Sequence, residues 1–420
     1  MAGVLAGNML GFVRVAVTAY LLGTHSRADT LSVTMGPIDA LNPVLINSMV
    51  FAFVPMLTGA AAGEERRAMF FRLRYVFFRV FAALAAALIL LAPWLMKALA
   101  PGLDPQYFGT AVTLLRIFAL STFAAGAAAV YCALLYTDRR FAPFAFYSSA
   151  LNASIAAGAL FLWKLLGIYA FAVGYAVGTF AQLGIVYWAT RRELAGKSPA
   201  PAPIPWREIL AKPAFFGVYA AGLGLNITFT RAWATHAGPG MAAALDYCMR
   251  GVTVPVAILV NPLSNSLLPE IARLRSLFRW REAFRLIDRT LALATLVAVG
   301  GCGFALLFRQ PAIALLFERG EFHHSSTLLV SAVFLGLGPS LVGWSLIEVM
   351  ARSLFALDRP WPPVCAAAIP VLFNLVFTLG TDARRPEQIG LGATLGLLFG
   401  FLTLFTLAHT GRKRWVPEAR

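Results

Sequence analysis

Residues 75–96 read YVFFRVFAALAAALILLAPWLM, in which Arg79 is the single charged side chain. A helix needs about 20 mostly apolar residues to cross the hydrocarbon part of a bilayer, and this stretch is long enough. Arg79 lies near one end of the stretch, where its long side chain can reach the membrane surface. The stretch therefore predicts a transmembrane helix.

Similar apolar stretches recur along the chain. They lie near residues 4–23, 30–60, 75–96, 110–136, 143–163, 168–190, 214–235, 241–269, 290–308, 327–351, 363–380 and 390–409. The chain is 59% hydrophobic and 13% charged, with a mean hydropathy of +0.74, whereas soluble domains carry about a quarter charged residues. We therefore expect an all-α polytopic membrane protein of about twelve transmembrane helices.

The two longest stretches, 30–60 and 241–269, exceed one crossing and contain several prolines. Proline removes a helix hydrogen bond and clashes with the preceding turn. We expect these two helices to be kinked or broken.

Several residue pairs recur about 220 positions apart, which indicates an internal repeat. The matched features are Asn47 with Pro55 and Asn261 with Pro269, Asp138-Arg139 and Asp358-Arg359, and Asn152 and Asn374. Because six helices return the chain to the same side, two six-helix lobes would be related by an axis along the membrane normal. Transporters built in this way bind their substrates at the interface between the two lobes.

The repeat gives a domain organisation with four parts. A first lobe covers residues 1–193, and a second covers 213–410. A linker rich in alanine and proline, 194–212, joins them, and residues 411–420 form a tail.

The strong positive charge of the chain, +16, follows the predicted membrane topology. The loops on one predicted side hold about three times as many Lys and Arg residues as the loops on the other, and such loops face the cytoplasm. This asymmetry predicts that both termini are cytoplasmic. It also explains the charge without a nucleic-acid partner.

Two arginines lie deep in predicted helices, Arg14 in the first lobe and Arg250 in the second. A charge there costs about 2.5–3.5 kcal/mol on insertion scales, so each is a candidate functional residue. Guanidinium groups offer paired donors that suit phosphate. The alternative is an ion pair within the membrane, such as Arg14 with Asp39 or Arg250 with Asp246. Asp39 and Glu348 are also candidate ion-coupling carboxylates, for Na⁺ or H⁺.

Enzymatic chemistry finds no support in the sequence. The nucleotide-binding loop G-x-x-x-x-G-K-[ST], the zinc motif H-E-x-x-H and the nucleophile elbow G-x-S-x-G are all absent. The four cysteines are scattered through apolar stretches, so neither a metal centre nor a disulfide framework is expected. We predict no catalytic residue, no metal ligand and no cofactor.

The sequence resembles the MurJ/MviN family of lipid II flippases, within the multidrug/oligosaccharidyl-lipid/polysaccharide exporter superfamily. The likeness rests on Leu10–Arg14, Ala28-Asp29, Phe51–Pro55, Arg231, Gly240, Leu245–Arg250 with Pro255, Leu267–Pro269 and Leu316–Phe322. These segments follow the family's motifs in order through nearly the whole chain.

The resemblance implies an alternating-access flippase of the bacterial inner membrane. Its central cationic cavity would bind the pyrophosphate of an undecaprenyl-linked glycolipid. By motif position, the residues carried over are Arg14, Asp29, Arg231 and Arg250. Asn8 stands where the family pattern has an arginine, and we include it among the candidate substrate-binding residues.

The chain also departs from the family pattern. Asn42-Pro43 replaces a basic pair, Met249 replaces an acidic residue, and the family commonly has fourteen helices. Two alternatives therefore stay open: a flippase for a lipid-linked exopolysaccharide or O-antigen unit, and a scaffold paralogue of an envelope-synthesis complex that transports nothing. A drug or cation exporter of the same superfamily would need an acidic cavity instead.

Overall fold

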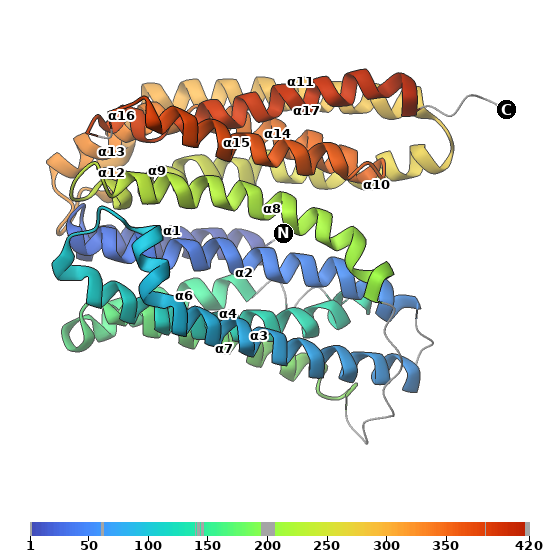
Figure 1. Cartoon of the computed structure of the whole chain (residues 1–420), viewed down its shortest axis with the longest axis horizontal. Helices are drawn as coiled ribbons and strands as arrows, with labels where there is room; N and C mark the ends of the chain where they lie inside the picture. The colour runs from blue at the N-terminus through green and yellow to red at the C-terminus, as the bar shows by residue number, and fades with distance from the viewer. Residues whose placement is uncertain are drawn as a thin grey trace. The chain divides into compact units, whose positions relative to one another are not determined.

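The computed structural model describes residues 2–59, 63–138, 140, 143, 147–194, 206–382 and 384–415. The elements in this part of the chain are all helices, which confirms the all-α fold class. Contacts between Cα atoms divide the chain into two compact units, Met1–Gly217 and Val218–Arg420 (Figure 1). Each unit is described by itself.

The first unit is a bundle built around α4. Its helices are α1 (Ala2–Leu22), α2 (Ser26–Gly59), α3 (Glu64–Leu99), α4 (Pro105–Thr137), α6 (Tyr147–Leu166) and α7 (Tyr169–Thr190). Helix α4 packs against α2, α3 and α7, while α1 packs against α6. A small residue in α4 allows α3 to pack closely against it, since a Cβ at Gly126 would lie 2.3 Å from the ring of Phe81.

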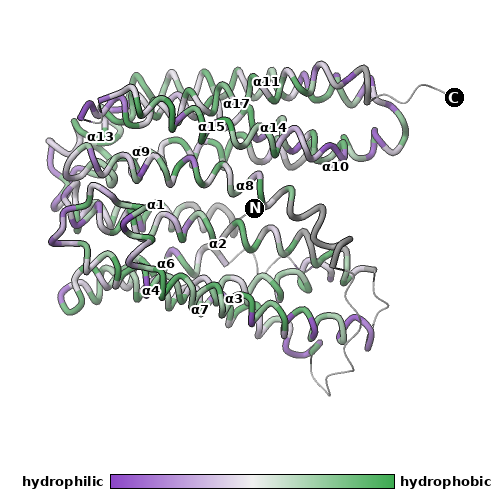
Figure 2. The backbone as a smooth tube through the Cα atoms, in the orientation of Figure 1, coloured by the Kyte–Doolittle hydropathy of each residue, from purple (hydrophilic) through white to green (hydrophobic). Residues whose placement is uncertain are grey.

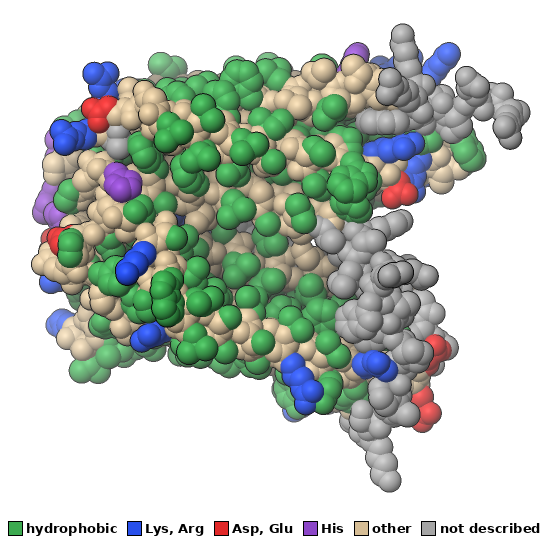
Figure 3. Space-filling view, in the orientation of Figure 1, with side chains coloured by type: hydrophobic (Ala, Val, Ile, Leu, Met, Phe, Trp, Pro, Cys, Tyr) green, Lys and Arg blue, Asp and Glu red, His purple; other side chains and the backbone are tan. Residues whose placement is uncertain are grey.

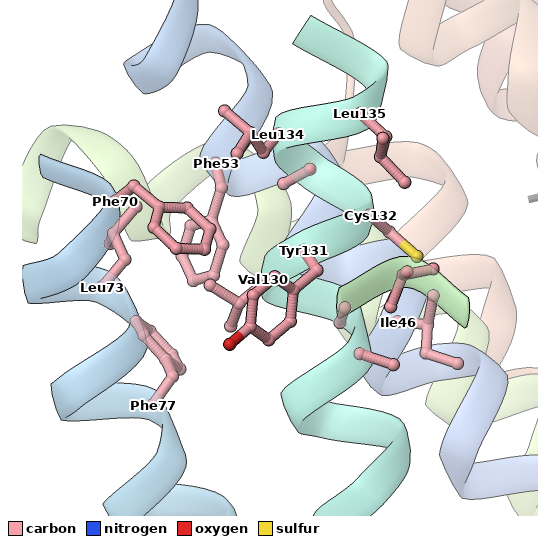
Figure 4. Packing of buried hydrophobic residues seen from close by; sticks show 14 of the residues in the cluster. Ile46, Phe53, Phe70, Leu73, Phe77, Val130, Tyr131, Cys132, Leu134 and Leu135 are labelled. Atoms are coloured by element: carbon pink, nitrogen blue, oxygen red, sulfur yellow. The ribbon is translucent and has the colours of Figure 1, made fainter. Parts of the chain in front are cut away.

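Aromatic side chains fill the space between α2, α3 and α4 (Figure 4). Phe53 of α2 meets Phe77 of α3 with ring centroids 4.7 Å apart. Phe70 of α3 meets Tyr131 of α4 at 5.4 Å. Edge-on and tilted rings of this kind add to the stabilisation that buried area provides, so this cluster holds one end of the first unit together.

The second unit is built around α14. Helix α8 (Trp206–Ala234) enters it from the first unit, and the others are α9 (Met241–Pro255), η1 (Val256–Val260), α10 (Asn261–Ser276), α11 (Trp280–Leu307), α12 (Arg309–Phe317), α13 (His324–Leu337), α14 (Ser340–Ala356), α15 (Trp361–Leu379), α16 (Pro386–Ile389) and α17 (Leu391–Trp415). Helix α14 packs against α10, α11 and α17. The short π-helix η1 follows Pro255 and interrupts the path from α9 to α10, as the prolines of this stretch predict.

The helices pair in the same way within each unit. Helix α4 contacts α2, α3 and α7 in the first unit, and α14 contacts α10, α11 and α17 in the second. The pair α6–α7 likewise corresponds to α15–α17. This packing is what two copies of one six-helix plan would give. The boundaries predicted near residues 194 and 212 stay predictions, because residues 195–205 lie outside the described part of the chain.

Eight helices of the described residues are long and apolar enough to cross a membrane. A ninth crossing is the bent pair α13 and α14, which meet at 44°. The predicted count of twelve therefore stays a prediction. Apolar residues run along the helices and polar residues gather toward their ends (Figure 2).

The outer helix faces are apolar as well. Phe161, Leu165, Leu307 and Leu379 are each about four-fifths exposed, and the visible faces of the helices carry mainly apolar side chains (Figure 3). Apolar surface on this scale is matched by the hydrocarbon of a bilayer rather than by water.

Candidate functional site

Arg14, in the middle of α1, is a buried charged residue of the first unit. Its Nη2 lies 3.0 Å from Oδ2 of Asp39 on α2. The arginine side chain is 5% exposed and the aspartate side chain 27% exposed. The structure thus shows the ion pair that the sequence left as an alternative, with the carboxylate on the more open side of the pair.

Asp39 has a second donor in the phenol of Tyr175 on α7. Asn42, one turn along α2, donates from Nδ2 to Tyr175 Oη at 3.4 Å and to Ser121 Oγ at 3.3 Å. Tyr175 and Asn42 are both almost fully buried. The network fixes the position of the Asp39 carboxylate from three helices, α1, α2 and α7, and Ser121 ties it to α4.

The second unit holds a pair of the same kind between its first two helices. Arg231, near the end of α8, donates from Nε to Oδ1 of Asp246 on α9 at 2.6 Å. The two side chains are 12% and 26% exposed. Arg250, one helical turn along α9, was named in the sequence as an alternative partner of Asp246, and the structure shows that Arg231 binds this carboxylate. Helix α9 places Arg250 at intermediate burial, four residues beyond Asp246.

Glu348 of α14, the other candidate ion-coupling carboxylate, is paired within its own helix. Its Oε1 accepts from Nε of Arg352 at 2.7 Å, and the Glu348 side chain is 15% exposed. The buried phenol of Tyr219 on α8 lies beside this carboxylate. Each candidate carboxylate therefore has an arginine and a tyrosine as neighbours.

For the remaining candidate residues from the sequence, the structure gives the location. Asp29 is buried in the first turn of α2. The backbone of Asn8 belongs to α1, and its side chain lies outside the described residues. No group of three or more His, Cys, Asp and Glu side chains in the described part of the chain could hold a metal ion.

Sequence reasoning missed three members of these networks. Tyr175, Tyr219 and Asn42 lie in otherwise apolar helices, where a buried phenol or amide must find a hydrogen-bond partner. Their signal was a polar group inside a predicted span. Which partner each one meets depends on how the helices pack, and sequence spacing does not give that.

A comparison with known families shows to which family the chain belongs. The model of the family described as "Lipid II flippase MurJ" matches residues 18–416. The chain belongs to the MurJ lipid II flippase family. This confirms the resemblance noted in the sequence, and it confirms that the chain is a transport protein rather than an enzyme.

Two curated relatives span most of the chain. The lipid II flippase MurJ of Burkholderia cenocepacia is 29% identical, covering 95% of this chain and 81% of its own length. The probable lipid II flippase MurJ of Rhizobium meliloti is 27% identical, covering 97% and 80%.

Solved structures share the fold. A lipid II flippase MurJ in an inward closed conformation superposes with a TM-score of 0.83 at 19% identity, covering 97% of this chain and 87% of that chain. An inward-facing multidrug resistance MATE family transporter of the MOP superfamily gives a TM-score of 0.81 at 11% identity, covering 98% and 96%. These likenesses confirm the MATE/MOP-like architecture.

Proposed function

We propose that the protein is a flippase that moves an undecaprenyl-pyrophosphate-linked sugar precursor, similar to lipid II, across the bacterial inner membrane by alternating access. The observation that carries this proposal is the family match over residues 18–416. Both termini are proposed to lie in the cytoplasm, because most of the basic loops lie on one predicted side of the membrane.

Arg14 and Arg250 are the proposed ligands of the pyrophosphate. A guanidinium group stays charged at any physiological pH and offers parallel N–H donors to phosphate oxygens. Asp29 and Arg231 are proposed to gate the outer side, and Asn8 completes the substrate-binding set. The substrate is the glycolipid itself, in contact with the surrounding membrane lipids.

Asp39 gives this binding site an ion-coupling element. The carboxylate already occupies one donor of Arg14, at 3.0 Å, and it is the more exposed partner. A pyrophosphate that approaches Arg14 therefore meets a like charge first, and the two anions compete for the same guanidinium. A proton or Na⁺ that neutralised Asp39 would free Arg14 for the substrate. Glu348, paired with Arg352, is the corresponding candidate in the second unit.

The test is transport by the purified protein in vesicles that contain fluorescent undecaprenyl-linked substrates. We expect Arg14→Gln to lower the rate of translocation at least about ten-fold, because a charged hydrogen bond contributes about 1.5–3 kcal/mol. Arg116→Gln is the matched control. Arg116 is an arginine of α4 whose side chain is exposed and donates to the backbone oxygen of Ile89, so this variant should keep its rate.

A double variant separates loss of transport from loss of fold. Arg14→Gln alone leaves the Asp39 carboxylate without its partner, whereas Arg14→Gln with Asp39→Asn removes both charges. We expect the double variant to melt like the unsubstituted protein and still fail to transport. Full transport by the double variant would contradict the proposed role of Arg14.

The sugar is tested in the same vesicles. Substrates that differ only in their sugar compare a peptidoglycan precursor with an exopolysaccharide unit. Selective movement of the first supports the proposal, and selective movement of the second replaces it. A protein that moves neither, while binding other envelope proteins, would be a scaffold.

A further inference from the structure

One end of the first unit carries a cluster of five charged side chains from three helices and their flanking turns. Arg66 and Arg67 lie in the first turn of α3, Asp138 caps the end of α4, Arg140 follows it, and Glu193 lies just beyond the end of α7. Nη1 of Arg66 lies 3.0 Å from Oδ1 of Asp138. Arg140 forms an ion pair with Glu193. None of these five side chains belongs to the proposed substrate-binding or ion-coupling residues.

A hollow of about 310 Å³ opens between these groups. It is lined by Gly63, Arg66, Arg67, Phe70, Leu134, Asp138, Glu193 and Leu194. This volume lies at the lower end of the range of small-molecule sites, about 300–1,000 Å³. We call it the Arg66–Glu193 hollow. Its wall combines three apolar side chains with two cationic and two anionic ones.

The charged groups of the hollow are only partly satisfied by one another. Nε of Arg66 is buried without a hydrogen-bond partner, although Nη1 of the same side chain is paired. The pKa of Glu193 is raised by burial and, next, by the nearby charge of Asp138. Two carboxylates held this close repel each other when both are ionised. A cation placed between them would relieve that repulsion.

A ligand that suits this wall needs both signs of charge. An anionic group is required beside Arg66 and Arg67, and a compact ammonium with several N–H donors is required beside Asp138 and Glu193. The hollow lies at helix ends, where the head groups of a bilayer are found. We propose that the Arg66–Glu193 hollow binds the phosphoethanolamine head group of a membrane phospholipid, with the phosphate on the arginines and the ammonium on the carboxylates.

Two simpler lipid preferences are distinguishable from this one. A merely basic surface would select an anionic lipid such as phosphatidylglycerol. A merely lipid-facing groove would accept phosphatidylcholine, whose trimethylated ammonium has no N–H to donate to a carboxylate. Phosphatidylethanolamine should be preferred over both, since it alone among the three supplies an anion together with N–H donors.

The experiment measures retention of lipids by the full-length purified protein in detergent, by native mass spectrometry. The three lipids carry identical acyl chains. We expect phosphatidylethanolamine to be retained about ten-fold more tightly than either of the others, as one additional charged hydrogen bond would give. Glu193→Gln and Arg67→Gln should each remove this preference. Arg74→Gln is the control: this arginine of the same helix stacks on Phe71, away from the hollow.

Soluble phosphoethanolamine identifies the source of the head group. If it displaces the lipid, the hollow recognises the head group alone; if it does not while phosphatidylethanolamine is still selected, the acyl chains contribute as well. Either result supports the proposal. Equal retention of phosphatidylcholine, a preference for phosphatidylglycerol, or a preference that survives both Glu193→Gln and Arg67→Gln would overturn it. Melting curves of each variant confirm that the protein measured is folded.

Discussion

Gly336 shows how a single residue fixes the packing of the second unit. A Cβ built on this residue of α13 would lie 1.9 Å from the backbone oxygen of Glu387 in α16. Backbone atoms cannot turn aside as a flexible side chain can. The backbone oxygen of Gly336 also accepts a hydrogen bond from Thr394 at 2.7 Å. Any larger residue would therefore push α13 away from α16 and α17.

We expect Gly336→Ala to destabilise the protein by about 1–3 kcal/mol or more, because the added methyl group must displace backbone. Thermal unfolding in detergent measures the effect. Gly303→Ala is the matched control, since a Cβ on this glycine of α11 meets nothing within 4 Å; the substitution should be neutral or stabilise by about 0.4–1 kcal/mol. Equal melting temperatures for the two variants would refute the close approach.

Arg14 marks the limit of what single residues in the sequence can reveal. Its position in the first apolar stretch was enough to predict a functional or paired arginine, and Asp39 was correctly named as its candidate partner. The choice between free cation and ion pair needed the 3.0 Å contact. For Asp246 the sequence offered Arg250 as one possible partner, and the structure adds Arg231 from the preceding helix, which sequence spacing did not indicate. Local spacing cannot predict contacts between helices.

At the scale of helices, the recurring asparagines join the first helix of each unit to a later one, α1 to α6 in the first unit and α8 to α15 in the second. Asn152 of α6 donates to the backbone oxygen of Gly7 in α1 at 3.2 Å. Asn374 of α15 donates to Oδ1 of Asn226 at 3.0 Å and to Oγ1 of Thr230 at 2.8 Å, both in α8. The internal repeat noted in the sequence thus has a physical basis in matching contacts.

Asn374→Ala should lower the stability of the second unit by about 1–3 kcal/mol, because it removes two buried hydrogen bonds and leaves their acceptors unpaired. The melting temperature reports the loss. Thr403→Val serves as the control. This partly exposed threonine of α17 donates to the backbone oxygen of Phe399 in its own helix, so its replacement should change stability by less than about 0.5 kcal/mol. A melting temperature unchanged by Asn374→Ala would mean that α15 does not depend on this bond to α8.

Some breaks between helices were predicted from the sequence and others were not. The prolines of residues 241–269 indicated a broken helix, and η1 interrupts the path there. The stretch 327–351 was expected to be one span, yet α13 ends at Leu337 and α14 begins at Ser340. Gly338 and Pro339, which lie between the two helices, indicate this break, but the surrounding apolar residues favoured one continuous span. The short helices α12 and α16 were also missed, because each has too few residues for a helical pattern to stand out.

At the scale of the whole molecule, each unit has an arginine–aspartate pair at the end of its central helix, α4 in the first unit and α14 in the second. In the first, Arg66 lies 3.0 Å from Asp138 after α4; in the second, Arg275 lies 3.9 Å from Asp358 after α14. The recurring Asp-Arg dipeptides of the sequence therefore mark equivalent helix ends. In the predicted topology both ends face the cytoplasm, together with most of the basic loops. The predicted orientation of the chain rests on that distribution of charge.

Thiol labelling tests this orientation directly. In a variant with its four cysteines replaced, Gln106→Cys would lie in the exposed first turn of α4, and Glu282→Cys in the exposed first turn of α11. A membrane-impermeant maleimide should label the first in intact cells and the second only after the membrane is opened, because the loop beside Glu282 is rich in arginine and stays inside. The reverse pattern would invert the topology, and labelling of both sites in intact cells would exclude the odd number of crossings that α4 to α10 are predicted to contain. The reverse pattern would also place the Arg66–Glu193 hollow, at the opposite end of α4 from Gln106, in the outer leaflet, so this measurement fixes the side from which its lipid must come.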